Sequence, residues 1–233
     1  MFEKSFHFIG KAPLSKSLLN RALIIKSWYP HFVIHGSSLC EDILIMESAV
    51  ANLRQKKEFD CGLSGTAFRF LAVRLSREKG EFILKTDKAL LGRPLGEVSS
   101  LLSQLSVSIQ KTNQAYLISS EGWKLQGDCI YVPSQITSQW ASALLLNSWH
   151  FNQDLYFVLN KSAVSYPYFE MTLSFVRSLG LVVQQKGDEF FIPKKQSLKI
   201  AEYHPEQDKS CLFALACFAV LNGQAVFLDW EEE

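Results

Sequence analysis

Two hydrophobic patterns alternate along the chain. Short apolar runs, which are typical of strands, occupy residues 32–35, 82–85, 129–132, 155–159 and 190–193. Between these runs, apolar residues recur three and four positions apart, as on one face of an amphipathic helix. The series Leu95, Val98, Leu101, Leu102 and Leu105 is an example. The alternation predicts an α/β protein in which helices pack against sheets.

Four of the predicted helices repeat one pattern. Each copy has a small or polar start and continues as an apolar helix of about three turns. The copies begin at Ser17, Gly65, Ser138 and Lys209. A second set of helices, at residues 42–53, 94–105 and 168–179, interleaves with the first, and strand-like runs at 107–110 and 181–185 follow the last two. We therefore predict repeated units of two helices and several strands, not a doubly wound nucleotide-binding fold.

The starts of the first set of helices, at residues 15–17, 64–66, 137–139 and 208–210, are polar and mostly rich in hydroxyl groups. Such side chains cap helices, and the same ends attract anions through free N–H groups and the helix dipole. If the units pack around a common axis, these ends converge, and Lys16, Arg21, Arg69 and Arg93 supply positive charge. The pattern then predicts a site for a phosphorylated, carboxylated small molecule. The alternative is that the hydroxyl groups are ordinary caps and the arginines lie on solvated faces.

Charge and composition narrow the possible partners. The chain of 233 residues has 24 basic and 23 acidic residues, so its net charge of +1 gives no electrostatic footprint for nucleic acid or an anionic membrane. No apolar run reaches the roughly 18 residues of a membrane span, and the charged start, with Glu3, Lys4 and Lys11, does not resemble a signal peptide. We expect a cytoplasmic protein with no nucleic-acid or membrane partner.

Other candidate chemistry is weak. The five cysteines form no CxxC motif, and we expect reduced, mostly buried thiols. The five histidines show no metal-binding spacing, so we expect them to be structural or exposed and predict no metal site. Asp60 and Cys61 are interpreted as a strand end. Trp28, Trp140 and Trp149 fall on apolar helix faces and are predicted to lie in the core.

Six segments resemble the 5-enolpyruvylshikimate 3-phosphate synthase (EPSP synthase) family, in the family's order. The segments that match are SKSLLNRAL at 15–23, SGTAFRFL at 64–71, GRPLG at 92–96, TSQWASALLL at 137–146, SYPYFEMTLSFVRSLG at 165–180 and, more loosely, DKSCLFALACF at 208–218. They resemble SKSxSNRAL, AGTAxRxL, ERPIG, SSQxxTALL, SxPYxxxTLxxMxxFG and DxSSASYFLAAA of the family. The related enzyme acting on UDP-N-acetylglucosamine fits less well, because its lysine is followed by Asn-Ala.

The resemblance implies a fold and a reaction. The fold is α/β (α+β), with repeated βαβαββ-type units forming an inverse α/β domain over residues 13–201. Residues 1–12 and 202–233 would form the crossover segments and an incomplete second domain. The reaction is enolpyruvyl transfer from phosphoenolpyruvate to shikimate 3-phosphate, in the shikimate pathway of chorismate and aromatic amino-acid biosynthesis. The resemblance implies no metal or organic cofactor, and a monomer if the chain is full length.

The resemblance also implies roles for individual residues. Shikimate 3-phosphate would be bound by Lys16, Ser17, Arg21, Thr137, Ser138, Gln139, Ser165 and Tyr168, with Ser165 on its phosphate. Phosphoenolpyruvate would be bound by Lys16, Gly65, Thr66, Arg93 and Gln139, with Arg69 supporting the loop. Lys16 is the candidate catalytic residue. The physical chemistry agrees, because both substrates are polyanions and these residues are mostly donors or cations.

Some positions depart from the family pattern. Leu63 replaces an asparagine, and Thr137 replaces a serine but keeps its hydroxyl. Residues 89–91 are less polar than usual, and Cys211 stands at the second serine of the last motif.

The family's base aspartate is expected beyond the Asp208 motif, so the chain is expected to be a fragment of a longer enzyme or a natural short form. Two alternatives stay open. One is a non-catalytic half, or degenerate paralogue, that binds shikimate 3-phosphate. The other is a transferase with another acceptor.

Overall fold

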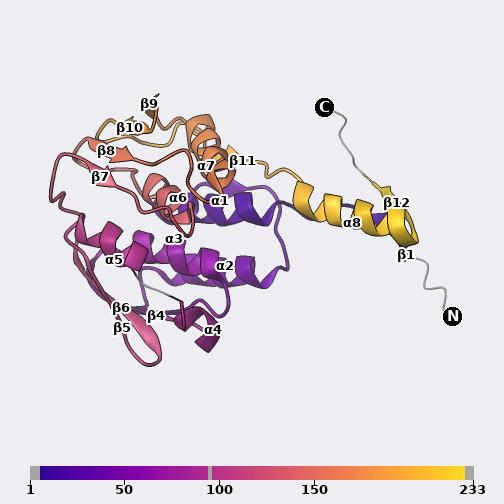
Figure 1. Ribbon diagram of the computed structural model, residues 1–233, viewed down its shortest axis with the longest axis horizontal. Coiled ribbons are helices and arrows are strands. Elements are labelled where there is room, and N and C mark those ends of the chain that lie inside the picture. The colour runs from indigo at the N-terminus through magenta and orange to yellow at the C-terminus, as the bar shows by residue number, and fades with distance from the viewer. Residues whose placement is uncertain (1–5, 94–95, 229–233) are drawn as a thin grey trace.

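The computed structural model describes residues 6–93 and 96–228 of the chain. Figure 1 shows a larger body and a smaller arm, which contains helix α8 (Lys209–Asn222) and strands β1 (Phe6–Gly10) and β12 (Gly223–Phe227). Among the helices of these residues, none is both long enough and apolar enough to cross a membrane.

Two sheets of the body share one topology. The first sheet has the order β3 (Glu58–Asp60), β4 (Lys79–Lys85), β6 (Ala115–Glu121), β5 (Ser108–Lys111). The second has the order β7 (Ile130–Tyr131), β8 (Leu155–Val158), β10 (Glu189–Ile192), β9 (Gln184–Lys186). In each sheet the first two strands are parallel and the other pairs are antiparallel. The sheets are therefore two copies of one βαβαββ unit, and the predicted repeat is confirmed.

Two further parallel strand pairs extend the repeat. Strand β11 (Glu202–Tyr203) pairs with β2 (Val33–Ile34), and β1 pairs with β12. In each of the four parallel pairs, one of the two strands is directly preceded in the chain by a helix. These helices are α3 (Gly65–Leu75) before β4, α6 (Gln139–Leu146) before β8, α1 (Lys16–Trp28) before β2, and α8 before β12. They are the four copies of the first helical pattern in the sequence.

The second set of predicted helices is also present. It consists of α2 (Glu41–Asn52), α5 (Gly96–Ser103) and α7 (Tyr166–Ser178). Part of the predicted helix at 94–105 lies outside the described residues, because Pro94 and Leu95 are not described. A short helix, α4 (Lys88–Leu91), covers the segment that departs from the family in polarity.

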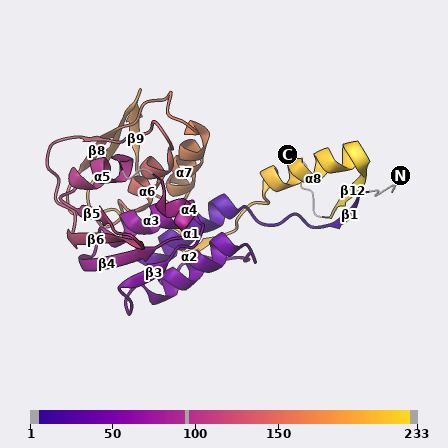
Figure 2. The ribbon, with the colours of Figure 1, turned by 60° about the horizontal axis from the view of Figure 1, so that its bottom comes forward.

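Helices α1, α3 and α6 of the first set lie at the centre of the body, whereas α8 lies in the arm. Figures 1 and 2 both place α3 and α6 between the two sheets. Helix α6 is apolar on all sides, and Trp140 to Leu146 are all buried. A helix that is apolar all round is stable only when it is surrounded by other elements. The burial of these helices leaves their polar first turns as the places where they reach solvent.

Several expectations need correction. Trp149 is buried, but it lies beyond the end of α6. That helix ends at Asn147, whose side-chain amide donates a hydrogen bond to Ala143 O. The cysteines are not mostly buried. Cys61 is buried, whereas Cys40 lies exposed at the start of α2 and Cys217 lies exposed on α8. Strands β1, β6, β11 and β12 were not predicted, since their apolar and polar residues form no long regular pattern.

Two antiparallel segments connect the body to the arm. Ser15 N donates to Glu206 O at 2.8 Å, and Asp208 N donates to Pro13 O at 2.8 Å. Beyond this connection, α8 buries only Leu212 of its own residues. The boundaries of the predicted domains, 13–201 for the first and 1–12 with 202–233 for the rest, stay a prediction.

Candidate anion-binding site

A pocket of about 330 Å³ opens at the first turns of four helices, α1, α3, α6 and α7. Its lining consists of Lys16, Ser17, Asn20, Arg21, Thr66, Phe70, Thr137, Ser138, Gln139, Ser165 and Tyr168. The structure therefore brings together all eight residues assigned to shikimate 3-phosphate by resemblance, and Thr66 with them. Among the described residues, the lining contains two cations and no carboxylate.

The hydroxyl groups at the helix starts differ in the hydrogen bonds that they make. Ser15 Oγ accepts a hydrogen bond from Leu18 N at 3.4 Å, and Ser64 Oγ accepts one from Ala67 N at 3.1 Å. These two serines are ordinary caps, as the alternative interpretation held. Ser138 makes no cap; its hydroxyl donates to Ser165 O at 2.7 Å. Ser138 thus ties the start of α6 to the start of α7 across the pocket.

Ser165 has an unusual backbone conformation. Its φ is 60° and its ψ is 35°, in the left-handed region that costs a non-glycine residue free energy. The carbonyl of Ser165 accepts from Ser138 Oγ and from Tyr168 N, at 2.7 and 3.0 Å. These two bonds fix the turn that presents Ser165 to the pocket.

Arg21 is buried, and its hydrogen-bond partners among the described residues are neutral. The residue is 3% exposed, and its guanidinium donates to Thr172 Oγ1, Ser17 O and Tyr168 O at 2.7, 2.7 and 2.9 Å. Burial lowers the pKa of Arg21 to about 10, because water no longer stabilises the charge. The alternative of a solvated arginine is therefore wrong for this residue. A buried cation without a carboxylate partner is costly, and a bound anion would offset that cost.

Lys16 has an acidic neighbour that the sequence did not reveal. Lys16 Nζ lies 2.9 Å from Asp42 Oδ2, a side chain of α2, and this hydrogen bond raises the pKa of Lys16. The ammonium group is half-exposed and fully charged at neutral pH. Asp42 therefore positions the candidate catalytic lysine at the pocket without closing it off from solvent.

Gln139 links the pocket to the residues assigned to phosphoenolpyruvate. Gln139 Nε2 donates to Thr66 Oγ1 at 3.2 Å, and Arg69 Nη1 donates to Gln139 Oε1 at 2.8 Å. Arg69 and Arg93 line a second pocket of about 260 Å³, together with Leu90 of α4. Burial, and then the charge of Arg93, lower the pKa of Arg69. The two sets of predicted residues are therefore adjacent and connected.

Gly65 leaves space beside the guanidinium group of Arg69 at the start of α3. A Cβ atom at this position would lie 2.7 Å from Arg69 Nη1 and 3.5 Å from Arg93 Nη1. Arg69 Nη1 also donates to Gly65 O at 3.0 Å. The glycine lets both guanidinium groups approach the start of α3, which supports the assignment of this loop to an anion.

Three residues at the site, Asn20, Phe70 and Asp42, were not predicted. Asn20 is fully buried on α1, and its amide donates to Lys16 O at 3.1 Å. Its Oδ1 atom is buried without a hydrogen-bond partner and belongs to a residue that lines the pocket. A signal was present, since Asn20 is a polar residue in the apolar middle of the first repeat.

The fold and the pocket define the class of protein: an α/β repeat protein with a basic pocket at its helix ends. The sequence model of the family described as EPSP synthase (3-phosphoshikimate 1-carboxyvinyltransferase) matches residues 32–229. The chain therefore belongs to the EPSP synthase family.

Relatives and solved structures agree with this membership. A Colwellia psychrerythraea protein named 3-phosphoshikimate 1-carboxyvinyltransferase is 30% identical over 178 residues, covering 74% of this chain and 42% of its own length. A Bacteroides fragilis protein of the same name is 28% identical, covering 91% of this chain and 52% of its own length. The EPSP synthase structure from Acinetobacter baumannii superposes with a TM-score of 0.71 at 19% identity, covering 94% of this chain and 53% of that one. The chain thus spans about half the length of the relatives it matches.

Proposed function

We propose that this chain forms the shikimate 3-phosphate-binding half of a 3-phosphoshikimate 1-carboxyvinyltransferase. The observation that carries the proposal is the pocket at the ends of α1, α3, α6 and α7, which contains the buried cation Arg21 and, among the described residues, no carboxylate. Helix N-termini and cations together suit a phosphate ester. Membership of the family supports this ligand over other phosphorylated compounds.

Each pocket residue would then have a stated task. Ser165 would contact the phosphate of shikimate 3-phosphate, and Tyr168 would lie near the shikimate ring. Thr137, Ser138 and Gln139 would hold the molecule. Ser17 and Arg21 would supply further donors. Phosphoenolpyruvate would lie toward Gly65, Thr66 and Arg93, with Arg69 supporting the loop. Lys16 would sit between the two substrates, where its ammonium group stabilises the negative charge that moves during addition and elimination.

The location and partners belong to the same proposal. Free thiols at Cys40 and Cys217 fit a reducing compartment such as the cytoplasm. The net charge of +1 fits small-molecule substrates and no nucleic-acid partner. The monomeric state that the resemblance implies stays a prediction.

Calorimetric titration with shikimate 3-phosphate tests the proposal. The 233-residue chain should bind one molecule. Ser138→Ala should weaken binding by about 1–3 kcal/mol, because it leaves Ser165 O without the hydrogen bond that fixes the turn presenting Ser165 to the pocket. Ser178→Ala is the matched control, because this serine also donates to a helix carbonyl, Phe175 O, but lies outside the pocket. A folded chain that does not bind the ligand would refute the proposal.

A second measurement separates the open alternatives. Phosphate release from phosphoenolpyruvate that depends on shikimate 3-phosphate would support the transferase. Binding without phosphate release would support a non-catalytic half. Binding of UDP-N-acetylglucosamine in preference to shikimate 3-phosphate would support a transferase with another acceptor.

A further inference from the structure

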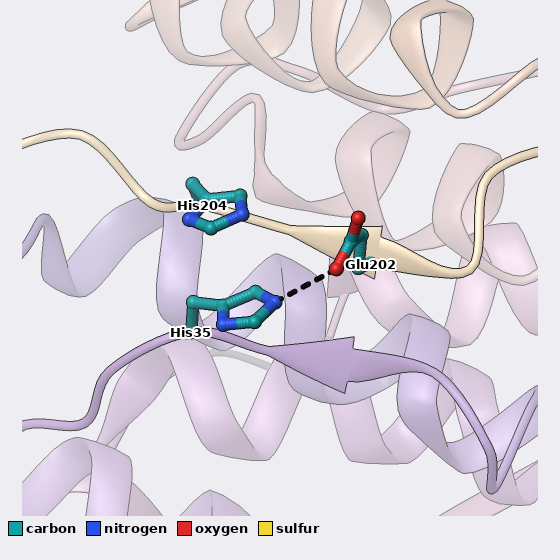
Figure 3. A group of neighbouring side chains, drawn as sticks. All are labelled: His35, Glu202 and His204. Carbon is teal, nitrogen blue, oxygen red and sulfur yellow. Dashed lines mark hydrogen bonds and ion pairs between the residues drawn. The ribbon is translucent and has the colours of Figure 1, made fainter.

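Three potential metal ligands meet at the strand pair β2–β11, although they are far apart in the sequence. In the parallel register of this pair, Val33 lies opposite Glu202 and Ile34 lies opposite Tyr203. His35 and His204 directly follow these two strands, so they lie opposite each other. Glu202 and His204 are two residues apart in one extended segment and share a face. Figure 3 shows the three side chains on the same side of the strand pair.

Their geometry is compact. His35 Nε2 lies 3.0 Å from Glu202 Oε2. The imidazole rings of His35 and His204 are stacked, with centroids 4.0 Å apart and an angle of 1° between their planes. One ligand atom from each residue lies within 4.8 Å of the other two. All three side chains are exposed, so they are free to adjust their rotamers around an ion.

Two imidazole nitrogens and one carboxylate form a ligand set that Zn²⁺ accepts, with water in the fourth position. In a tetrahedral zinc site the ligands lie about 2.0–2.2 Å from the ion and hence about 3.3 Å from one another. The observed separations are close enough for rotamer changes alone to bring the three atoms to an ion. We propose that His35, Glu202 and His204 bind a divalent transition-metal ion, with Zn²⁺ as the fitting example.

This site is separate from the anion pocket, since none of its three residues lines that pocket. The inference therefore does not rest on the proposed function. Strands β2 and β11 are two residues each, and two main-chain bonds flank the pair, Val33 N to Ala201 O and His35 N to Tyr203 O, both 2.9 Å. A bound ion would link the segment of β11, which precedes α8 in the chain, to the segment of β2 in the body. It would thereby stabilise the connection between the body and the arm.

The alternative is an ordinary His35–Glu202 ion pair with His204 stacked beside it. Titration of the metal-free chain with Zn²⁺, in competition with a chromophoric chelator, distinguishes the two. The proposal predicts one bound ion and an increase in the unfolding temperature with Zn²⁺. His35→Ala and His204→Ala should each weaken binding at least about tenfold, because even the loss of an outer-shell partner costs about 10–100-fold. Mg²⁺ should not bind, since it prefers all-oxygen sites.

The control variants change other side chains that can bind a metal ion. His31→Ala and Cys40→Ser alter exposed residues close to His35 in the sequence and should leave the Zn²⁺ affinity unchanged. Glu202→Gln keeps the shape of the side chain and provides a second variant if a histidine variant fails to fold. The proposal is overturned if the chain binds no Zn²⁺, or if the folded variants of His35, Glu202 and His204 bind it as tightly as the original chain.

Discussion

Helices α1 and α8 are capped in the same way: Ser15 Oγ accepts from Leu18 N, and Asp208 Oδ1 accepts from Cys211 N. Helix α1 then buries eight of its 13 residues, whereas α8, with 14 residues, buries only Leu212. Both sequences are apolar copies of one repeat. The difference therefore comes from the neighbours: α2, α3, α6 and α7 contact α1, whereas β1 and β12 are the described elements that pack against α8 in the arm (Figure 2).

The two helices show which feature creates an anion-binding site at a helix N-terminus. A polar cap occurs at the start of both helices, but the starts of α3, α6 and α7 lie beside that of α1 and enclose a pocket. The start of α8 contributes no lining residue to that pocket; Asp208 Oδ2 instead accepts from Lys16 N at 3.3 Å. Convergence of several units, and not the single capped helix, creates the anion-binding geometry.

Thiol labelling should give the largest contrast between body and arm. Cys217 on α8 is exposed and should react at once, whereas Cys61 is buried and should react at least about 1,000-fold more slowly, because labelling needs an opening that costs several kcal/mol. Equal rates, measured by mass spectrometry after timed exposure to a thiol reagent, would contradict the description of the body as a packed core.

Cys61 should also make the free energy of unfolding depend on pH. Burial raises its pKa to about 12 from an ordinary value of 9.0. Between these values the native state keeps a proton that the unfolded chain releases, so stability falls as pH rises from about 9 toward 12. Urea unfolding across this range should show a smaller fall in Cys61→Ala than in the original chain. An unchanged pH dependence would contradict the assignment to Cys61.

Truncation of apolar side chains should separate the two helices energetically. Ile24→Ala in α1 removes a fully buried side chain and should lower the free energy of unfolding by about 2–5 kcal/mol. Leu221→Ala in α8 alters a side chain that is 76% exposed and should change it by less than about 0.5 kcal/mol. A large effect of Leu221→Ala in urea unfolding would show that α8 packs against a surface in solution.

The buried arginine should matter for binding more than an exposed one. Arg21→Lys keeps the charge but cannot reproduce all three hydrogen bonds, and the affinity for shikimate 3-phosphate should fall by about 1.5–3 kcal/mol. Arg177→Lys is the control, since this arginine on α7 donates to Val183 O and does not line the pocket. Equal calorimetric affinities for the two variants would contradict a direct role for Arg21.

Removing the helix caps should change stability least, and it compares α1 with α8 directly. Ser15→Ala should lower global stability by about 0.5–2 kcal/mol, because α1 is part of the core. Asp208→Ala should mainly speed amide hydrogen exchange in the first turn of α8. A fall in global stability from Asp208→Ala that exceeds that of Ser15→Ala would reverse the assignment of α1 to the core and α8 to the periphery.

Much of the fold was predictable, and the reasons are physical. The apolar helices at Ser17, Gly65, Ser138 and Lys209 repeat because each precedes one strand of a parallel pair. Strand β6 was missed because polar Ser119 and Ser120 interrupt its apolar pattern, although Ser120 is buried and donates to Ser76 O. Sequence spacing could not reveal contacts between distant segments.

The site shows the same limit. Its helix starts were predicted from repeated polar residues. The pairing of Lys16 with Asp42 depends on how α2 packs against α1, which no local pattern encodes. The meeting of His35 with Glu202 and His204 likewise depends on the register of β2 and β11. Residues that act together across 167 positions, such as His35 and Glu202, become visible only in the folded chain.

The most direct test of convergence is a titration of the ¹⁵N-labelled chain with shikimate 3-phosphate, followed by NMR. The account predicts that the backbone amide signals of Ser17, Thr66, Gln139 and Tyr168, one on each of four helices, shift together with a single dissociation constant. The amides of the first turn of α8 that lie beyond Asp208 should shift far less. Shifts confined to one helix, or different dissociation constants for different helices, would contradict a single pocket built from converging helix ends.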